Sequence, residues 1–143
     1  MNSKSEKPEC REHSDGSKEW FLNGKRHRAD GPAIDYSDGT KHWFLDDKLH
    51  RTDGPACEGA DGEKHWYLDG KRHRADGPAI EYPDGEKHWY LDGQRHRTDG
   101  PAIELSDGSK CWFLFGEKYE DLELWRVASE MFVLLFPRFE GEE

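Results

Sequence analysis

Tryptophan recurs in this chain at one fixed interval. The five residues are Trp20, Trp43, Trp66, Trp89 and Trp112, and each follows the last by 23 positions. A fixed period of this length is typical of a tandem array, in which one small supersecondary unit is stacked on copies of itself. The function of the chain must therefore be read from a repeated surface.

Other residue types keep the same register. Residues 61–83 form one unit, and residues 84–106 are nearly its copy. Leucine recurs at Leu22, Leu45, Leu68, Leu91 and Leu114, and a His-Arg pair begins at His27, His50, His73 and His96. The segment Asp-Gly-Pro-Ala begins at Asp30, Asp53, Asp76 and Asp99. So many aligned columns exclude chance as their origin.

Each unit contains two turn signals, which in residues 84–106 are both Asp-Gly. Asp84-Gly85 lies between two runs of strand-forming residues, which is the strongest short-range signal for a β-hairpin. If these two residues are the whole loop, Ile80 lies opposite Trp89 and one face of the hairpin is apolar. Asp92-Gly93 then ends the hairpin, and a polar connection follows as far as Pro101.

One hairpin alone is marginally stable in water, so the units are expected to stack. The sequence predicts a mostly β fold: an elongated single-sheet array of about five stacked β-hairpins, with a C-terminal capping α-helix. The tryptophan, leucine and isoleucine columns would form its continuous core. Two strands per unit would separate equivalent residues by roughly 10 Å.

The repeat resembles the MORN family of β-hairpin repeats, which share its period of about 23 residues. The residues that carry the match in one unit are Gly77, Asp84, Gly85, Trp89, Asp92, Gly93 and His96. The likeness covers residues 13 to about 118, although arginine follows each histidine where the family has another glycine. The resemblance implies a scaffold for protein or membrane binding. This variant of the repeat looks like those of bacterial, phage and large-virus proteins.

Composition restricts the choice of partner. The net charge is −10, and residues 117–143 hold eight acidic and three basic side chains, a net charge of −5. Duplex DNA and anionic lipid would repel such a chain, which argues against membrane binding. The three scattered cysteines form no disulfide framework and favour a reducing cytoplasm, of a bacterium or an infected host cell. Cys57 takes the place of an isoleucine and is expected to be a buried thiol.

The His-Arg-x-Asp ladder has two interpretations. It could present a binding face, with candidate residues His50, Arg51, His73, Arg74, His96 and Arg97. Alternatively, each aspartate caps its Gly-Pro turn, each arginine pairs with an aspartate, and each histidine packs on the aromatic column. Residues that stacking requires must recur in every unit, so the structural interpretation is favoured, and a ligand site in the His-Arg clefts stays open.

Metal, nucleic-acid and catalytic sites are disfavoured. Equivalent histidines roughly 10 Å apart cannot share one zinc ion, whose bonds are about 2.1 Å long. Arginines alternate with aromatic residues as in single-strand binders, but the net charge has the wrong sign. The sequence has no nucleophile elbow, phosphate-binding loop or dinucleotide fingerprint. We expect neither an enzyme nor a cofactor.

The repeat stops after Gly116, and an uninterrupted apolar segment follows. Residues 119–137 are predicted to form a helix that Pro137 ends. Two stripes keep helical spacing: Leu122, Trp125, Ser129, Phe132 and Phe136, and Leu124, Ala128, Met131 and Leu135. One stripe suffices to cap the array, so the surplus predicts a contact with another protein or with a second copy. The candidate residues for that contact are Trp125, Met131, Phe132, Leu135 and Phe136.

The whole chain is therefore divided into four parts. Residues 1–12 are expected to be a flexible lead without a signal sequence, 13–118 the MORN-like repeat array, 119–137 the helix, and 138–143 an acidic tail. The expected function is non-enzymatic protein binding through the sheet face, the C-terminal helix or both, and one specific version is a phage-type inhibitor that docks on a host defence enzyme. A small-ligand or nucleotide-binding module and a homomeric structural assembly protein are the alternatives.

Overall fold

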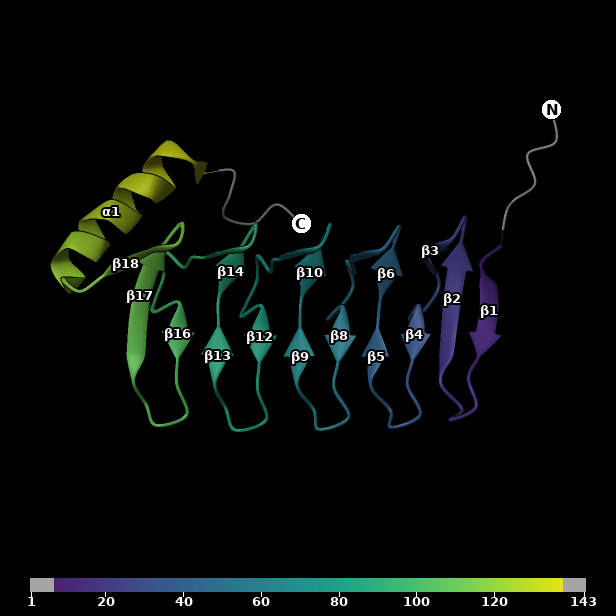
Figure 1. The fold of residues 1–143 in the computed structure, drawn as a ribbon. Coiled ribbons are helices and arrows are strands. Elements are labelled where there is room, and N and C mark those ends of the chain that lie inside the picture. Colours follow the sequence, from purple (N-terminus) through teal and green to yellow (C-terminus); the bar gives the residue numbers. More distant parts are fainter. Residues whose placement is uncertain (1–6, 138–143) are drawn as a thin grey trace, which may run out of the picture.

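The computed structural model describes residues 7–137, which form a long antiparallel sheet with one helix at its C-terminal end (Figure 1). The strands are β1 (Glu9–Glu12), β2 (Lys18–Leu22), β3 (Lys25–Arg26), β4 (Ile34–Asp35), β5 (Lys41–His42), β6 (Phe44–Leu45), β7 (Lys48–Leu49), β8 (Cys57–Glu58), β9 (Lys64–His65), β10 (Tyr67–Leu68), β11 (Lys71–Arg72), β12 (Ile80–Glu81), β13 (Lys87–His88), β14 (Tyr90–Leu91), β15 (Gln94–Arg95), β16 (Ile103–Glu104), β17 (Lys110–Leu114) and β18 (Glu117–Tyr119). The helix is α1 (Leu122–Leu135).

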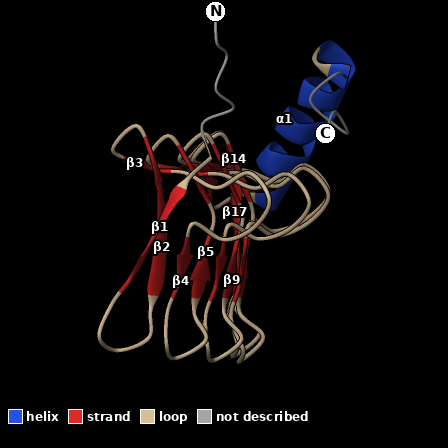
Figure 2. Cartoon of the chain, turned by 90° about the vertical axis from the view of Figure 1, so that its right-hand side faces the viewer, coloured by secondary structure: helices blue, strands red, loops and turns tan. Residues whose placement is uncertain are grey.

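Twelve of these strands make one continuous sheet in the order β1-β2-β4-β5-β8-β9-β12-β13-β16-β17-β18, with β3 attached to β2. Three further hairpins, β6-β7, β10-β11 and β14-β15, form a separate row above it. Figure 2 shows this row bent away from the plane of the main strands. The predicted fold class is confirmed, and the architecture is compatible with a MORN-like repeat. Each unit, however, contains two hairpins rather than one.

The first hairpin of a unit has a three-residue loop. In the hairpin of β12 and β13, residues 83–85 form this loop. The Tyr82 N–H donates to the Glu86 carbonyl (3.0 Å), and the Gly85 N–H donates to the Tyr82 carbonyl (3.1 Å). The Asp84 carboxylate accepts the Glu86 N–H (3.0 Å). A two-residue hairpin loop needs positive φ at both positions, whereas of this Asp-Gly pair only Gly85 has it (φ 93°).

This loop corrects the predicted register by one residue. Ile80 pairs with His88 and not with Trp89. Trp89 instead donates its backbone N–H to the Ala102 carbonyl, at 2.8 Å, just before β16, the strand that begins the next hairpin of the sheet. Because side chains alternate between the faces of a strand, the shift changes which residues share a face.

The second hairpin has the two-residue loop that the first lacks. Asp92 (φ 48°) and Gly93 (φ 81°) both have positive φ, and Leu91 pairs directly with Gln94. The Gly93 N–H also donates to the Arg72 carbonyl of the preceding unit (2.8 Å). The turn that was expected to end the hairpin therefore starts another one, which ties adjacent units together.

The core is thin and lies within the main sheet. Its most buried members are Ala33, Ala56, Ala79 and Ala102, all 0% exposed, with Ile34, Ile80 and Ile103 beside them. Ala79 accepts the Trp66 N–H and donates to the His88 carbonyl, so its backbone joins two neighbouring strand regions. One apolar cluster contains Ala79, Ile80 and Tyr90, with Trp66 packed against it. Because its members come from two consecutive units, a unit cannot bury its own core alone.

The tryptophans do not form the buried spine that the sequence predicts. All five rings are half-buried, and no large side chain among residues 7–137 is fully buried. The physical reason is that one sheet has no second layer to cover its outward residues.

The N-terminal edge corrects a second expectation. Residues 9–12 are not a flexible lead, because they form β1 and pair along their full length with β2. The guanidinium of Arg11 lies 4.4 Å from the ring centre of Phe21. An exposed edge strand rich in charged residues discourages the addition of further strands. Residues 1–6 and the predicted acidic tail at 138–143 lie outside the described residues.

The helix begins later than predicted. Tyr119 belongs to β18, and Asp121 caps the helix by accepting the backbone N–H groups of Glu123 (2.9 Å) and Leu124 (3.3 Å). Such a cap fixes where the helix can start. At the other end the helix stops at Leu135 instead of reaching residue 137.

The helix packs against the array at two positions where the sequence departs from the repeat. Glu120 stands in the arginine column, and the indole of Trp125 lies edge-on to Trp112 instead, with ring centres 6.5 Å apart. Phe115 stands in the aspartate column of the second turn, and its ring contacts Phe132 at 4.7 Å. The helix thus covers the last unit where the repeated residues no longer do so.

The second turn provides a test of the two-hairpin unit. Gly93→Ala should lower the free energy of unfolding by about 1–2 kcal/mol, because a Cβ at positive φ is strained while no close contact blocks it. Gln94→Ala, at the adjacent strand position, should change it by less than about 0.5 kcal/mol. Urea unfolding of both variants measures the difference, and equal midpoints would contradict the left-handed turn.

Candidate functional site

An arginine covers each of the first four tryptophans. The guanidinium carbons of Arg28, Arg51, Arg74 and Arg97 lie 3.9–4.0 Å from the ring centres of Trp20, Trp43, Trp66 and Trp89. In the third unit, Arg74 Nε donates to Asp76 (2.9 Å), and its Nη1 donates to the Pro78 carbonyl (3.1 Å) and to Glu81 (2.9 Å). The flat guanidinium shields the indole while its N–H groups hold the loop that follows.

This arrangement explains the glycine of the Asp-Gly-Pro-Ala segment. A Cβ built on Gly77 would lie 3.0 Å from Arg74 Cζ, which is tighter than most real contacts. Gly31, Gly54 and Gly100 have the same relation to the arginines of their own units. The aspartate of this segment binds arginine, whereas the aspartate of the first turn accepts a backbone N–H group, as Asp61 does from Glu63. The expected pairing of arginine and aspartate is therefore within one unit.

The histidine of the ladder connects consecutive units. His50 Nδ1 accepts the Asp69 N–H (3.0 Å), and His73 Nδ1 accepts the Asp92 N–H (3.1 Å). Each acceptor binds the second turn of the next unit. His96 repeats the bond with the Phe115 N–H (3.1 Å), and its ring contacts Phe132 of the helix at 5.2 Å. A ring nitrogen that accepts a hydrogen bond is unprotonated, so these bonds require the tautomer with its proton on Nε2.

A cleft lies between the ladders of two units. It has a volume of about 800 Å³ and is bordered by residues 51–54 and 73–76 together with Trp66 and Leu68. The cationic groups at its edge are Arg51 and Arg74, about four-fifths buried, and both are bound to carboxylates of their own units. A ligand in this cleft would compete with those internal bonds.

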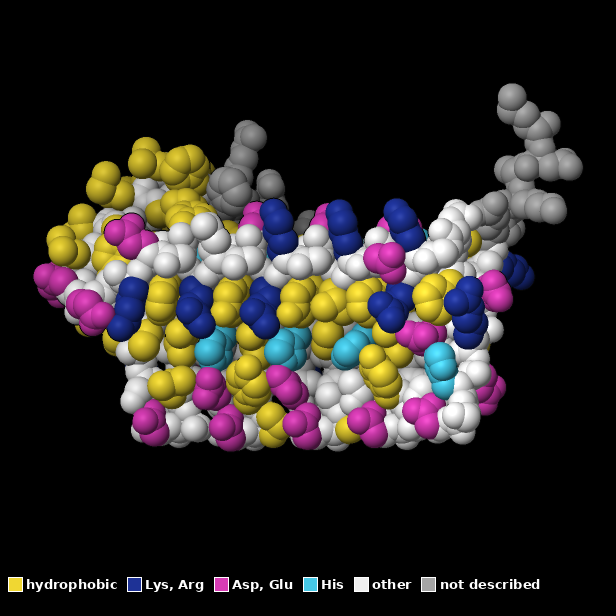
Figure 3. Space-filling model, viewed as in Figure 1, with side chains coloured by type: hydrophobic (Ala, Val, Ile, Leu, Met, Phe, Trp, Pro, Cys, Tyr) yellow, Lys and Arg dark blue, Asp and Glu magenta, His cyan; other side chains and the backbone are white. Residues whose placement is uncertain are grey.

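A second set of histidines lies on the other face of the sheet. His88 Nε2 bonds to Glu86 (2.6 Å), and His65 makes the equivalent bond to Glu63. His42 has Tyr36 edge-on to its ring at 5.3 Å. Burial lowers the pKa of His42 below its ordinary value of 6.5, and the charges of His65 and Arg26 act in the same direction. Figure 3 shows the histidines as a row below a band of hydrophobic and basic side chains.

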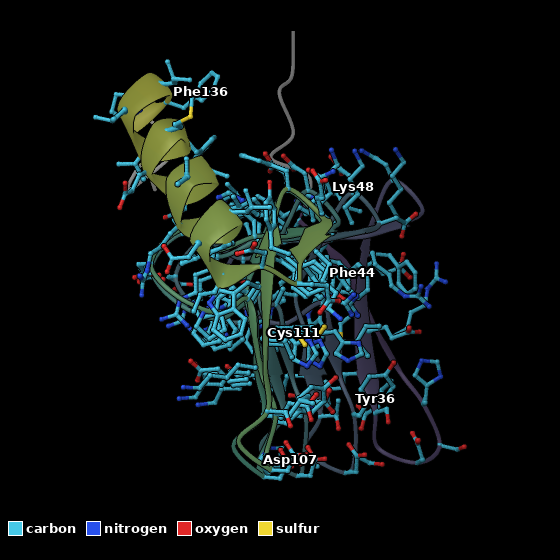
Figure 4. The ribbon with its side chains drawn as sticks, turned by 90° about the vertical axis from the view of Figure 1, so that its left-hand side faces the viewer. Tyr36, Phe44, Lys48, Asp107, Cys111 and Phe136 are labelled. Carbon is cyan, nitrogen blue, oxygen red and sulfur yellow. The ribbon has the colours of Figure 1, made fainter. Side chains whose placement is uncertain are left out.

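Within residues 7–137, most of the exposed large apolar side chains belong to the helix. The outer stripe, as we name it, comprises Leu124 (62% exposed), Val127 (57%), Met131 (55%), Leu134 (80%) and Leu135 (66%). These residues follow helical spacing along one side of α1, whereas Trp125 and Ser129 face the array. Figure 4 shows the helix projecting from the end of the sheet, with Phe136 at its far end.

The residues proposed from the sequence for partner binding divide between two environments. Trp125 (7% exposed) and the half-buried Phe132 pack on the array, whereas Met131, Leu135 and Phe136 are exposed. The His-Arg residues lie along the array, and the structure brings them to the helix only at His96, which is itself buried.

Sequence reasoning missed three members of the outer stripe: Leu124, Val127 and Leu134. Leu124 belongs to the second predicted helical stripe, so the signal was present. Val127 and Leu134 follow from the same spacing once Trp125 is assigned to the buried side.

Two kinds of site can be assessed over residues 7–137. In that range, no three histidine, cysteine, aspartate or glutamate side chains are arranged to hold a metal ion. No helix there has both the length and the apolar character that crossing a membrane requires.

Comparison with known proteins does not extend the argument. No family model matches the chain, and no curated protein matches its sequence.

The arginine stack gives a second test. Arg74→Lys keeps the charge but loses the flat, multiply bonded cover of Trp66, and should lower the free energy of unfolding by about 1–2 kcal/mol. The Trp66 environment becomes more polar, so the native fluorescence should shift to longer wavelength. Lys64→Ala, at an exposed position of β9, should leave both signals unchanged. An Arg74→Lys protein with the urea midpoint of the parent would contradict the role of the stack.

The half-buried imidazole of His42 gives a third test, the dependence of stability on pH. Because the pKa of His42 is lower in the folded chain, the unfolded chain binds the proton first. The stability contributed by neutral His42 is therefore complete above pH 6.5 and is lost as the pH falls below that value. The free energy of unfolding, measured from about pH 8 to about pH 5, should decrease less steeply for His42→Cys, the residue found in this column at Cys111. Identical slopes for the two proteins would refute this assignment.

Proposed function

We propose that this chain is a non-enzymatic protein-binding module that uses the outer stripe of α1. The observation that carries the proposal is the exposure of five large apolar side chains on one side of a 14-residue helix. A cap needs only the opposite side of the helix, which Trp125 and Phe132 supply. Apolar surface that stability does not require is typical of an interaction site.

Charge indicates the chemistry of the partner. The polar residues that flank the outer stripe include Glu123 and Glu130, and residues 117–143 carry a net charge of −5. Two copies that met through this surface would bring like charges together. We therefore propose a different protein as the partner, with an apolar groove for the stripe and basic residues at the rim of that groove.

A narrower version of the proposal makes the chain an inhibitor that docks on a host defence enzyme. It draws on the MORN-like resemblance to repeats of bacterial, phage and large-virus proteins, and on the acidic charge. The corresponding location is the cytoplasm of a bacterium or of an infected host cell, and the free thiols Cys10, Cys57 and Cys111 are compatible with it.

The cleft between the ladders supports a second candidate function, the binding of a small ligand or nucleotide. In its favour is a volume of about 800 Å³ beside two arginines. Against it stand the internal bonds of Arg51 and Arg74, which occupy the groups that would bind an anion.

The outer stripe can be tested by a triple variant, Leu124→Gln, Met131→Gln and Leu135→Gln. The partner is first identified by affinity purification from the native host and is then purified. Calorimetric titration should show that the variant binds at least about 100-fold more weakly, because apolar side chains at the centre of an interface carry most of its energy.

The matched control, Glu123→Gln with Glu130→Gln, alters the polar side of the same helix and should bind within about tenfold of the parent. Both variants should keep the parent's unfolding temperature, since the altered side chains are exposed. Undiminished binding by the triple variant would exclude the outer stripe. A parent protein that is dimeric by light scattering, while the triple variant is monomeric, would assign the stripe to self-association instead.

A further inference from the structure

One place on the histidine-bearing face departs from the repeat. A cavity of about 540 Å³ opens there, between His42 and His65. Gly59 lies in its wall at a position where the other units have Tyr36, Tyr82 and Leu105. In the same unit, Cys57 replaces the isoleucine of Ile34, Ile80 and Ile103. Two reductions in side-chain size at one point thus produce a site that occurs once in a repetitive surface.

The neighbouring unit shows what fits such a site. The ring of Tyr82 lies edge-on to His65 (centres 6.1 Å apart, planes at 80°) and to His88 (5.9 Å, 71°). The residues that flank Gly59 in the same way are His42 and His65, because Cys57 pairs with both in register. The cavity therefore has the two imidazole walls that hold an aromatic ring elsewhere in the array.

The backbone does not require glycine at this position. Gly59 lacks the positive φ of the turn glycines, and a Cβ there would meet first the Asp61 carboxylate, at 2.6 Å, which is the end of a flexible side chain. A larger residue could be accommodated, as Tyr82 is one unit further on. The conformation of the turn therefore does not explain why this position has glycine, and the absence of a side chain at Gly59 leaves the surface open there.

Charge selects among aromatic ligands. Asp38, Asp61 and Glu63 line the cavity, and no lysine or arginine lines it. The thiol of Cys57 is neutral at physiological pH, because burial raises its pKa to about 11. The charges of Arg26 and Arg72 act on His42 and Cys57, but the lining itself holds three carboxylates, which favour a cation over an anion.

We propose that this cavity binds an aromatic cation, with the ring between the imidazoles of His42 and His65 and the positive group beside the carboxylates of Asp38 and Asp61. The ligand could be a free arylalkylamine, or an aromatic side chain adjacent to a lysine in a polypeptide. Both sources share one recognition chemistry. The site is separate from the outer stripe of α1, so it does not depend on the proposed function.

The test uses tyramine as the cation and 4-hydroxyphenylacetate as its anionic counterpart with the same ring. Titration of the intact chain at about pH 7.5, where the amine is charged, should give binding of tyramine at least about tenfold tighter than of the anion. The imidazole proton resonances of His42 and His65 should shift with tyramine. Equal affinity for the two probes, or no binding of tyramine, would overturn the proposal.

Variants at the same column locate the site. Gly59→Tyr fills the cavity with the side chain found at Tyr82, and Gly59→Leu fills it with the one found at Leu105; both should abolish binding while the circular dichroism is unchanged. Tyr82→Gly combined with Ile80→Cys reproduces both reductions between His65 and His88 and should raise the stoichiometry from one to two. Full binding by both filled variants would place tyramine elsewhere and refute the inference.

The peptide N-acetyl-Tyr-Lys-amide separates the two sources. Binding at least about tenfold tighter than that of tyramine would assign the site to a polypeptide ligand, and the reverse order to a free amine.

Discussion

An arginine over the ring of each of the first four repeat tryptophans takes the place of the second layer that a sheet normally needs. In a single sheet the outward face has no other protein to cover it, so a tryptophan there would be exposed to water on one side. The stacked guanidinium excludes water from that side, and its N–H groups at the same time bind the carboxylate and carbonyl of the loop that follows. One arginine side chain therefore both covers the indole and fixes the loop that follows. The glycine of the Asp-Gly-Pro-Ala segment leaves room for its guanidinium.

The ends of the array follow from the same requirement. The interior units cover one another, but the last has no successor, and there Glu120 replaces the arginine. Trp125 then supplies an aromatic cover for Trp112, and Phe132 packs against His96 and Phe115, which make the last histidine bond. At the other end of the array, β1 pairs with β2 through backbone hydrogen bonds and so protects the edge of the first unit. Only the C-terminal solution uses a helix, and only a helix leaves an opposite face exposed for another role.

Much of this arrangement could be predicted from the sequence, because the repeat displays its columns directly. The period, the mostly β class, the terminal helix and its capping stripe all follow from spacing.

The register of the first hairpin could not be obtained from Asp84-Gly85 alone, since the same dipeptide serves two- and three-residue loops and only the φ of Asp84 separates them. The residues of β1 have no apolar alternation and do not match the repeated residue types, so the sequence predicts a flexible lead there. Their pairing depends on the exposed edge of β2. The tryptophans are half-buried because the fold is one sheet thick, and the spacing of residues in the sequence does not show the number of layers. Gly59 was visible as an exception to its column, but its meaning required the positions of the flanking imidazoles.

The bonds between neighbouring units have a genetic consequence. Each interior unit accepts and offers the same set of backbone and histidine contacts, so the edge it presents is independent of how many units precede it. Unequal recombination between copies could therefore lengthen or shorten the gene by whole units without disturbing either terminus. The distance between β1 and α1 would change in fixed steps, while the chemistry of both ends stayed the same. The divergent unit that contains Gly59 is the exception, because its loss or duplication would alter the surface and not merely its length.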